Sequence, residues 1–272
     1  MKKIIVCAAL LLFFASCNND DQKSSDKPLD QSQDMIQQFK PVINGVWVKK
    51  NYIKKLIKEK SAVEVADRAE GIMVFAIDTD KLKADSITVP VSYSNKKNGV
   101  VSLKFHPGRN STTIMLGSDE LSYTIKNQDT TLIIYHYDEA KRETATDKYI
   151  KAFNKQQTDD LSYAMTYLIN RGLLAGNYQG VDDAGKKLNI MLSEDGKIKG
   201  YPGLSSYYLQ NYPDAPLNKF DVITFNKGTP KEQKLAFEMK KRTLTLYPTT
   251  ANADSTLVMT DKPYMTLTKD RK

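Results

Sequence analysis

The sequence predicts a mostly β protein made of two tandem antiparallel β-barrels, each with few helices. Two observations carry this prediction. From Ile43 onward, short runs of β-branched and aromatic residues alternate with turn residues at close spacing, which is typical of all-β sandwiches and barrels. The same pattern begins again after a helical segment near residue 160, which indicates a second, similar unit.

The individual elements follow from hydrophobic periodicity. In the first half, strands are expected over residues 45–48, 72–77, 86–94, 100–105, 112–116, 121–125 and 132–137. In the second half, they are expected over residues 174–179, 188–192, 198–201, 222–225, 235–239, 243–247, 256–259 and 264–268. Asn98-Gly99 is suited to a tight hairpin turn.

Two helices are expected between these strands. Over residues 52–66, apolar residues recur at helical spacing and lysines fall elsewhere, so this helix should lay an apolar stripe on the barrel. Over residues 159–171, a second apolar stripe ends at Gly172, and Asp159 or Asp160 can cap its start.

An internal repeat supports the two-barrel prediction. Residues 121–135 and 235–247 each read as a hairpin with the same order of residue types. Two shorter matches keep the same order: Gly45-Val46-Trp47 with Gly176-Asn177-Tyr178, and Asp147-Lys148-Tyr149 with Asp261-Lys262-Pro263-Tyr264. Duplication explains all three matches, and convergent strand chemistry is the alternative.

Alternation along a strand predicts which side chains of the two hairpins point inward. The inward set in the first hairpin is Leu121, Tyr123, Ile125, Leu132 and Ile134. The matching set in the second hairpin is Leu235, Phe237, Met239, Leu244 and Leu246.

The N-terminus has the features of an export signal. Lys2 and Lys3 precede an apolar run over residues 4–14, which is too short to span a bilayer of about 30 Å comfortably. Small residues and Cys17 follow, and then a stretch rich in Asp, Gln, Ser and Lys with almost no apolar residue. We therefore expect a signal peptide over residues 1–16 and a disordered tether over residues 17–40.

The remaining boundaries follow from these elements. Residues 41–155 form the first expected barrel, residues 156–173 a linker helix, and residues 174–272 the second barrel. Cys7 lies in the signal and Cys17 at its end, so the mature domains have no thiol for a disulfide, a zinc site or a nucleophile. The 40 basic and 32 acidic residues are spread along the chain rather than gathered into a patch, which argues against nucleic-acid binding.

Residues 14–17, Phe-Ala-Ser-Cys, resemble the bacterial lipobox, in which the cysteine receives a diacylglycerol. The resemblance implies a lipid anchor at Cys17 and attachment to a membrane in the cell envelope. Asn18 differs from the aspartate that retains enterobacterial lipoproteins in the inner membrane, which favours the outer membrane. The acidic pair Asp20-Asp21 is similar to the surface-export signal of Bacteroidetes lipoproteins.

Gly45-Val46-Trp47 resembles the lipocalin motif Gly-x-Trp, in which the tryptophan closes one end of the barrel. The chain as a whole is similar to lipocalin-like lipoproteins of Bacteroidetes, over residues 43–153 and again over residues 174–269. The resemblance implies a barrel-closing role for Trp47 and, by analogy, for Tyr178, where the second unit departs from the motif. It also implies a small apolar ligand in a cup, although a barrel of this size can equally fill with its own side chains.

Candidate site residues are few. Residues 200–216 contain several prolines and four tyrosines that are candidate contacts for a glycan or a protein partner: Tyr201, Tyr207, Tyr208 and Tyr212. His106 and His136, the only histidines, have no second histidine or cysteine at metal-ligand spacing. His136 continues the inward alternation of Leu132 and Ile134 toward a barrel mouth, where a structural role is expected.

The sequence therefore favours a non-enzymatic, membrane-tethered protein that binds a small apolar or glycan ligand, with no cofactor and no metal. A structural or interaction lipoprotein that acts through its outer surface in an envelope complex is the alternative. A hydrolase of envelope polymers is a third candidate, which rests only on scattered carboxylates.

Overall fold

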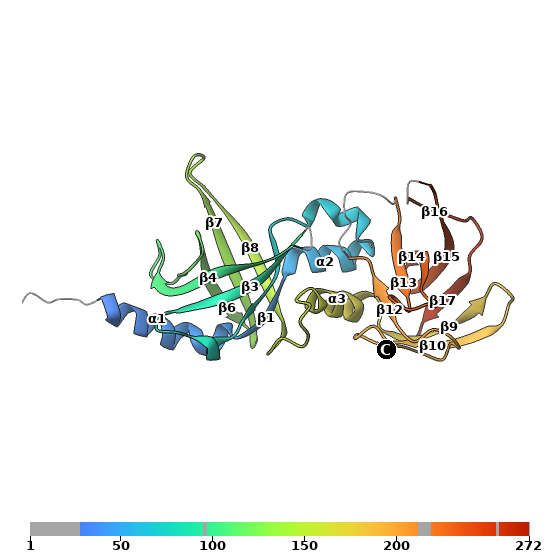
Figure 1. Ribbon diagram of the computed structural model, residues 1–272, viewed down its shortest axis with the longest axis horizontal. Helices are drawn as coiled ribbons and strands as arrows, with labels where there is room; N and C mark the ends of the chain where they lie inside the picture. The colour runs from blue at the N-terminus through green and yellow to red at the C-terminus, as the bar shows by residue number, and fades with distance from the viewer. Residues whose placement is uncertain (1–27, 95–96, 212–218, 254–255, 272) are drawn as a thin grey trace, which may run out of the picture.

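The computed structural model describes residues 28–94, 97–211, 219–253 and 256–271. The signal peptide, Cys17, the first part of the expected tether and Tyr212 lie outside these described residues. Figure 1 shows two β-barrels side by side, with helices α2 and α3 between them. The prediction of two tandem antiparallel barrels is confirmed.

Barrel 1 is a closed barrel in which each strand pairs with the next and β1 pairs with β8. Its strands are β1 (Gly45–Lys49), β2 (Ile72–Ile77), β3 (Ser86–Tyr93), β4 (Asn98–Pro107), β5 (Ile114–Leu116), β6 (Asp119–Lys126), β7 (Asp129–Asp138) and β8 (Glu143–Phe153). The helical segments around it are α1 (Pro28–Ile43), α2 (Lys50–Glu59), η1 (Val63–Arg68) and η2 (Thr79–Lys81).

Barrel 2 repeats this topology. Its strands are β9 (Gly176–Asp182), β10 (Lys187–Leu192), β11 (Ile198–Lys199), β12 (Tyr207–Leu209), β13 (Asp221–Phe225), β14 (Gln233–Lys240), β15 (Thr243–Ala251) and β17 (Met265–Lys269). The strand β16 (Leu257–Met259) pairs with β15 off this path. An isolated bridge between Lys197 and Ser206 joins the ends of β11 and β12, and the helical segments α3 (Tyr163–Ile169) and η3 (Asn170–Leu174) precede the barrel.

The interior of barrel 1 is filled by its own side chains. Trp47, Phe75, Phe105 and Tyr149 are fully buried there among aliphatic residues from β2 to β7. Phe39 of α1 belongs to the same apolar cluster. Such close packing stabilises the barrel without a ligand in its centre.

The two barrels share a second apolar cluster. It joins the interior of barrel 2 to the outer face of β1 and β2 through α2, η1 and α3. The expected apolar stripe is confirmed, because Tyr52, Ile53 and Leu56 of α2 are buried in this cluster. The helix expected over residues 52–66 is interrupted, because Lys60 adopts a left-handed conformation that ends α2 before η1 begins.

The first strands of the two barrels begin with the same arrangement. The indole Nε1 of Trp47 donates to the carbonyl of Ile43 at 2.8 Å, and the hydroxyl of Tyr178 donates to the carbonyl of Leu174 at 2.6 Å. In both cases the acceptor lies four residues earlier, where the preceding helical segment ends. Each aromatic side chain therefore ties the first strand of its barrel to that helical segment.

A lysine from the last strand completes each arrangement. Lys151 pairs with Trp47 across β8 and β1, and Lys269 pairs with Tyr178 across β17 and β9. Their Nζ atoms lie 4.9 Å and 6.0 Å from the respective ring centroids. This equivalence of Lys151 with Lys269 fixes the register between the two halves.

That register confirms part of the repeat and corrects another part. The hairpins β6–β7 and β14–β15 occupy the same places in their barrels, as predicted. The match of residues 147–149 with residues 261–264 is wrong. Tyr149 pairs with the residue two positions after Trp47, and in barrel 2 the residue that pairs two positions after Tyr178 is Leu267, not Tyr264. Barrel 2 has the additional strand β16 before β17, so the residues that look alike in the two sequences do not occupy equivalent positions in the two barrels.

The inward sets of the hairpins are confirmed except at one end. All five predicted side chains of the second hairpin are buried, as are Leu121, Leu132 and Ile134 of the first. Ile125 is 58% exposed, because it lies near the tip of the β6–β7 hairpin, and Tyr123 is half-buried against α1. Asn98 and Gly99 lie inside β4, paired with Ser92 and Val91, rather than in a turn.

The expected tether is wrong over residues 28–40, which belong to helix α1. Met35, Phe39 and Ile43 recur at helical spacing and pack into the cluster of barrel 1. The Phe39 ring meets Tyr123 edge-on at a centroid distance of 5.2 Å. The overall polarity of the segment conceals this narrow apolar stripe, which is sufficient to bury one face of a helix.

Candidate functional site

The inward face of barrel 1 changes from apolar to charged at one end. Ile134 pairs with Leu121 on one side and with Asp147 on the other, which places Asp147 on the inward face. His136 lies two residues beyond Ile134, so its side chain points the same way. Asp119, two residues before Leu121, completes this set from β6.

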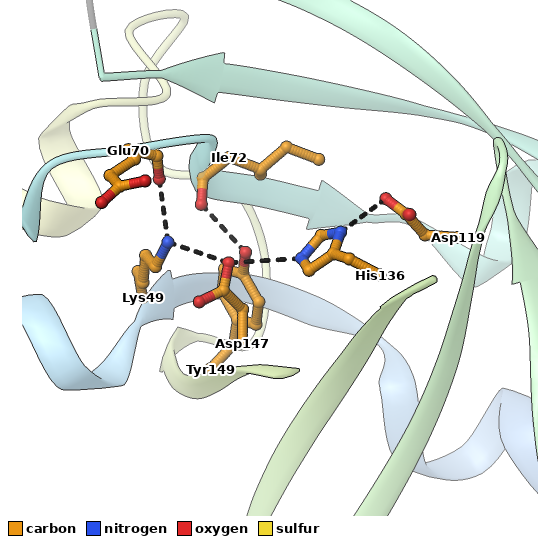
Figure 2. Close-up of polar contacts among 7 residues, drawn as sticks. All are labelled: Lys49, Glu70, Ile72, Asp119, His136, Asp147 and Tyr149. Carbon is orange, nitrogen blue, oxygen red and sulfur yellow. Dashed lines mark hydrogen bonds and ion pairs between the residues drawn. The ribbon is translucent and has the colours of Figure 1, made fainter. Parts of the chain in front are cut away.

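His136 lies between two carboxylates (Figure 2). Its Nδ1 is 3.0 Å from Asp119 Oδ2, and its Nε2 is 3.3 Å from Asp147 Oδ2. Both contacts favour the doubly protonated ring, which donates from both nitrogens. The hydrogen bond to Asp147 and the charge of Asp119 raise the pKa of His136, against the opposing effect of partial burial.

Lys49 joins the same network from the end of β1. Its Nζ lies 2.8 Å from Asp147 Oδ2 and donates to the carbonyl of Glu70 at 2.8 Å. Partial burial tends to raise the pKa of Asp147, but the hydrogen bonds from His136 and Lys49 outweigh it and lower the pKa below its ordinary value. Asp147 is therefore held as a carboxylate between two cations.

Tyr149 forms the boundary between this network and the apolar interior. Its hydroxyl donates to the carbonyl of Ile72 at 2.9 Å, and its ring packs against Phe75 at 4.8 Å. Burial raises the pKa of Tyr149 well above its ordinary value, which keeps the hydroxyl protonated. The charged layer consequently rests on an uncharged, closely packed floor.

A cavity of about 640 Å³ opens above the charged layer. We call it the mouth of barrel 1. It lies between β8 and the connection from β1 to β2, which carries α2 and η1. Its lining residues are Lys49, Asn51, Tyr52, Lys55, Arg68, Glu70, Gly71, His136, Ala145, Thr146 and Asp147.

Basic side chains outnumber acidic ones in this lining. Lys49, Lys55 and Arg68 are cations, His136 is a fourth when protonated, and Glu70 and Asp147 are the acids. Lys55 and Arg68 are exposed, and among the described residues they form ion pairs with neighbours on their own segment, Glu59 and Asp67. Such exposed pairs are weak, so both cations can turn to a ligand at small cost.

Barrel 2 lacks the charged layer at the equivalent positions. The register places Gly180 where barrel 1 has Lys49, and Met265 where it has Asp147. The pairing of the last two hairpin strands then places Pro248 where barrel 1 has His136, and Leu235, which pairs with Pro248, where barrel 1 has Asp119. The charged layer below the mouth is thus a feature of barrel 1 that the equivalent positions of barrel 2 do not share.

Barrel 2 nevertheless holds one wall of the mouth. The buried carboxylate of Asp221 accepts hydrogen bonds from the backbone N–H groups of Ala62 and Val63 at 2.7 and 3.1 Å. The hydroxyl of Tyr52, a lining residue, donates to the carbonyl of Asn211 at 2.5 Å. The position of α2 and η1 therefore depends on barrel 2.

The contacts of His136 do not place it to act as a general base on a molecule in the cavity. Both ring nitrogens of His136 face carboxylates, so neither presents a free lone pair to the cavity. Within the described part of the chain, no group of three or more His, Cys, Asp or Glu side chains could hold a metal ion. Lys49 already occupies the position beside Asp147 that a cation would take.

The tyrosines predicted as ligand or partner contacts differ in how far they are exposed. Tyr207 is wrong as a surface contact, because it is 4% exposed and its hydroxyl donates to the carbonyl of Ser193. Tyr201 is half-buried, with its hydroxyl 2.9 Å from that of Tyr264. Tyr208 remains partly accessible, with the Lys227 ammonium 3.7 Å from its ring centroid.

His106 has a different environment from His136. Its Nε2 lies 2.6 Å from Asp85 Oδ2, and its Nδ1 lies 3.2 Å from the Ser32 hydroxyl of α1. It therefore links the end of β4 to α1 and takes no part in the mouth.

Sequence reasoning placed His136 at a barrel mouth but missed its partners. Strand β8, which carries Asp147, was not predicted, because its inward positions include Ala145 and Asp147 and so lack the apolar alternation of a strand. Strand β12 was also missed, since only three residues pair within a proline-rich segment. An inward-facing carboxylate beside an inward-facing histidine is the signal that could have identified the site.

Comparisons with protein-family models, curated proteins and solved structures find no match to this chain. Among the described helices, none combines the length and apolar character that a membrane span requires.

Proposed function

We propose that this protein is a non-enzymatic binding protein that takes a small polar ligand with an anionic group at the mouth of barrel 1. The observation that carries the proposal is the cavity of about 640 Å³ with an excess of basic over acidic lining residues. Its volume is in the range of small-molecule sites in proteins. The expected classes of ligand are acidic sugars and other small carboxylates or phosphates.

The lining residues fall into a fixed group and an exposed group, and this arrangement supports an anionic ligand. Lys49 is fixed by Asp147, and His136 by Asp147 and Asp119, so they form a rigid polar floor whose charges balance one another. Lys55 and Arg68 lie at the rim and are exposed, so they can contact an anionic group directly. Charge-assisted hydrogen bonds of this kind contribute about 1.5–3 kcal/mol each.

A purely apolar ligand in a deep cup is less well supported. The aromatic and aliphatic side chains of the interior are in mutual contact from α1 to the level of Tyr149. Above Tyr149, an apolar ligand would have to displace water from charged groups without pairing them, which is unfavourable. The glycan form of the predicted ligand suits the mouth better than the apolar form.

Membrane attachment is part of the same proposal. We propose that Cys17 carries a lipid anchor and that the protein acts in the cell envelope at the outer membrane, as a lipocalin-like lipoprotein. The supporting features are the apolar run, the small residues before Cys17 and the polar stretch after it. Cys17→Ser should move the protein from the membrane fraction to the soluble fraction without changing its unfolding midpoint, and continued attachment would contradict the anchor.

Calorimetric titration of the Cys17→Ser protein with glucuronate and with inorganic phosphate tests the binding proposal. We expect Lys55→Ala/Arg68→Ala to weaken the affinity by about tenfold or more, since each tenfold step corresponds to about 1.4 kcal/mol. Lys58→Ala is the matched control, because Lys58 is on α2 but does not line the cavity.

Two results would contradict the proposal. One is the absence of binding of either anion to the parent protein. The other is an equal loss of affinity in the control and in the double variant. Either result would favour the alternative of an interaction lipoprotein that acts through its outer surface.

A further inference from the structure

A second cavity, of about 470 Å³, lies on the outer face of barrel 1. We call it the outer groove. From it we infer a carbohydrate-binding site for neutral sugars, separate from the mouth and independent of the function proposed for it. The residues that carry the inference are Arg109, Met115, Glu120, Tyr135, Tyr137 and Thr144.

The floor of the outer groove is the outward face of four adjacent strands. Glu120 pairs with Tyr135 across β6 and β7, and Tyr137 pairs with Thr144 across β7 and β8. Met115 pairs with Glu120 from β5. Because paired residues share a face, the two tyrosines lie in one row, on the opposite side of β7 from His136.

The wall of the outer groove is the ordered turn between β4 and β5. Glu120, whose side chain is 14% exposed, accepts from the backbone N–H of Arg109 at 2.9 Å and from the Thr113 hydroxyl at 2.6 Å. Asn110 accepts from both the N–H and the hydroxyl of Thr112. These contacts fix the wall before a ligand arrives, which lowers the entropic cost of binding.

Tyr137 is held in place while much of it stays accessible. The Arg109 guanidinium lies 3.6 Å from the centroid of its ring, and Tyr137 is 41% exposed. Exposed tyrosines on a rigid scaffold offer a flat apolar surface and a hydroxyl at low entropic cost. The C–H face of a pyranose ring matches such a surface, and its hydroxyl groups match the polar wall.

Charge distinguishes the ligand of the outer groove from that of the mouth. Arg109 is opposed by Glu120 at 3.9 Å and by Glu139 at 3.1 Å, so the groove has no excess of positive charge to select an anion. Its lining is also too polar for a lipid, because hydroxyl, amide and carboxylate groups surround the two rings and Met115. A neutral sugar is the class that fits both conditions.

Barrel 2 provides a matched control. Tyr247 occupies the position equivalent to Tyr135 and is likewise half-buried, but Thr249 stands where barrel 1 has Tyr137. The second ring is therefore specific to barrel 1.

The test is calorimetric titration of the Cys17→Ser protein with maltohexaose, cellohexaose, xylohexaose and mannohexaose. We expect binding of at least one of them, weakened about tenfold or more by Tyr137→Ala and less than about twofold by Tyr247→Ala. Lys55→Ala/Arg68→Ala should leave this binding unchanged, which separates the outer groove from the mouth. The inference is overturned if none of the four sugars binds, or if Tyr137→Ala and Tyr247→Ala have equal effects; circular dichroism checks that both variants fold.

Discussion

At the scale of single residues, His136 has the most distinctive environment in the structure. Its ring bridges a carboxylate on β6 and a carboxylate on β8, and Lys49 adds β1 to the same network. Four inward positions of the barrel are thereby occupied by charged groups that satisfy one another. Replacing one of these side chains by a neutral one leaves the charges of the others half-buried without a partner. Each replacement should therefore lower the free energy of unfolding more than the loss of a surface ion pair does.

His136 should make stability depend on pH in a defined direction. Its pKa is raised above the ordinary value of 6.5, so its contribution is complete below pH 6.5 and is lost as the pH rises through the folded-state pKa. We expect His136→Gln to lower the free energy of unfolding at pH 5.5 and to have a smaller effect at pH 9. Urea unfolding of both proteins at the two pH values measures this, and an equal difference at both would contradict the assignment.

The sequence predicts the position of some residues of the site and not of others. Alternation from Leu132 and Ile134 predicts the direction of His136 correctly, because period two is local. Asp119 and Asp147 belong to other strands, and their approach to His136 depends on a strand register that no local pattern contains. Tyr207 shows the converse error, since its neighbours suggested a surface loop while its own side chain enters the core.

At the scale of elements, helix α1 has the role of a core element. Its stripe of Met35, Phe39 and Ile43 packs into the cluster of barrel 1, and the Trp47 indole bonds to its last residue. The expected tether is consequently shorter than the composition suggested. Strand β8 is likewise an ordered element with a polar sequence, because its few inward side chains form contacts inside the barrel.

Phe39→Ala tests the role of α1. Phe39 is fully buried, and truncation of such a side chain typically costs about 3–5 kcal/mol. We expect a lower free energy of unfolding by about that amount, measured by urea denaturation. Gln37→Ala is the control, because Gln37 is exposed on the same helix and its change should stay within about 0.5 kcal/mol. Equal, small effects of the two substitutions would mean that α1 is a tether after all.

At the scale of the whole molecule, the two barrels share a strand topology but differ in the residues at the mouth end. They also share the tie between first strand and preceding helix, yet among the described residues the charged layer is found in barrel 1 and not at the equivalent positions of barrel 2. Barrel 2 instead packs against α2 and η1, which form one wall of the mouth. The repeat in the sequence predicts the two barrels, whereas their packing through α2, η1 and α3 depends on contacts between distant segments.

Asp221 tests the contribution of barrel 2 to the mouth. Asp221→Ala removes the acceptor of the Ala62 and Val63 N–H groups, and leaving such buried groups unpaired costs about 1–3 kcal/mol. We expect faster hydrogen exchange over residues 60–68 and a weaker affinity for glucuronate, although Asp221 does not line the cavity. Asp261→Ala, at an exposed aspartate of barrel 2, is the control. Unchanged exchange in η1 would show that barrel 2 does not hold this wall.

An NMR titration of the labelled Cys17→Ser protein with glucuronate measures whether the mouth of barrel 1 is the site of an anionic ligand. We expect saturable shifts of backbone amide signals in residues 49–55, 68–71 and 136–147, with little change at the equivalent end of barrel 2. Saturable shifts centred on barrel 2, or no shifts at millimolar glucuronate, would contradict it.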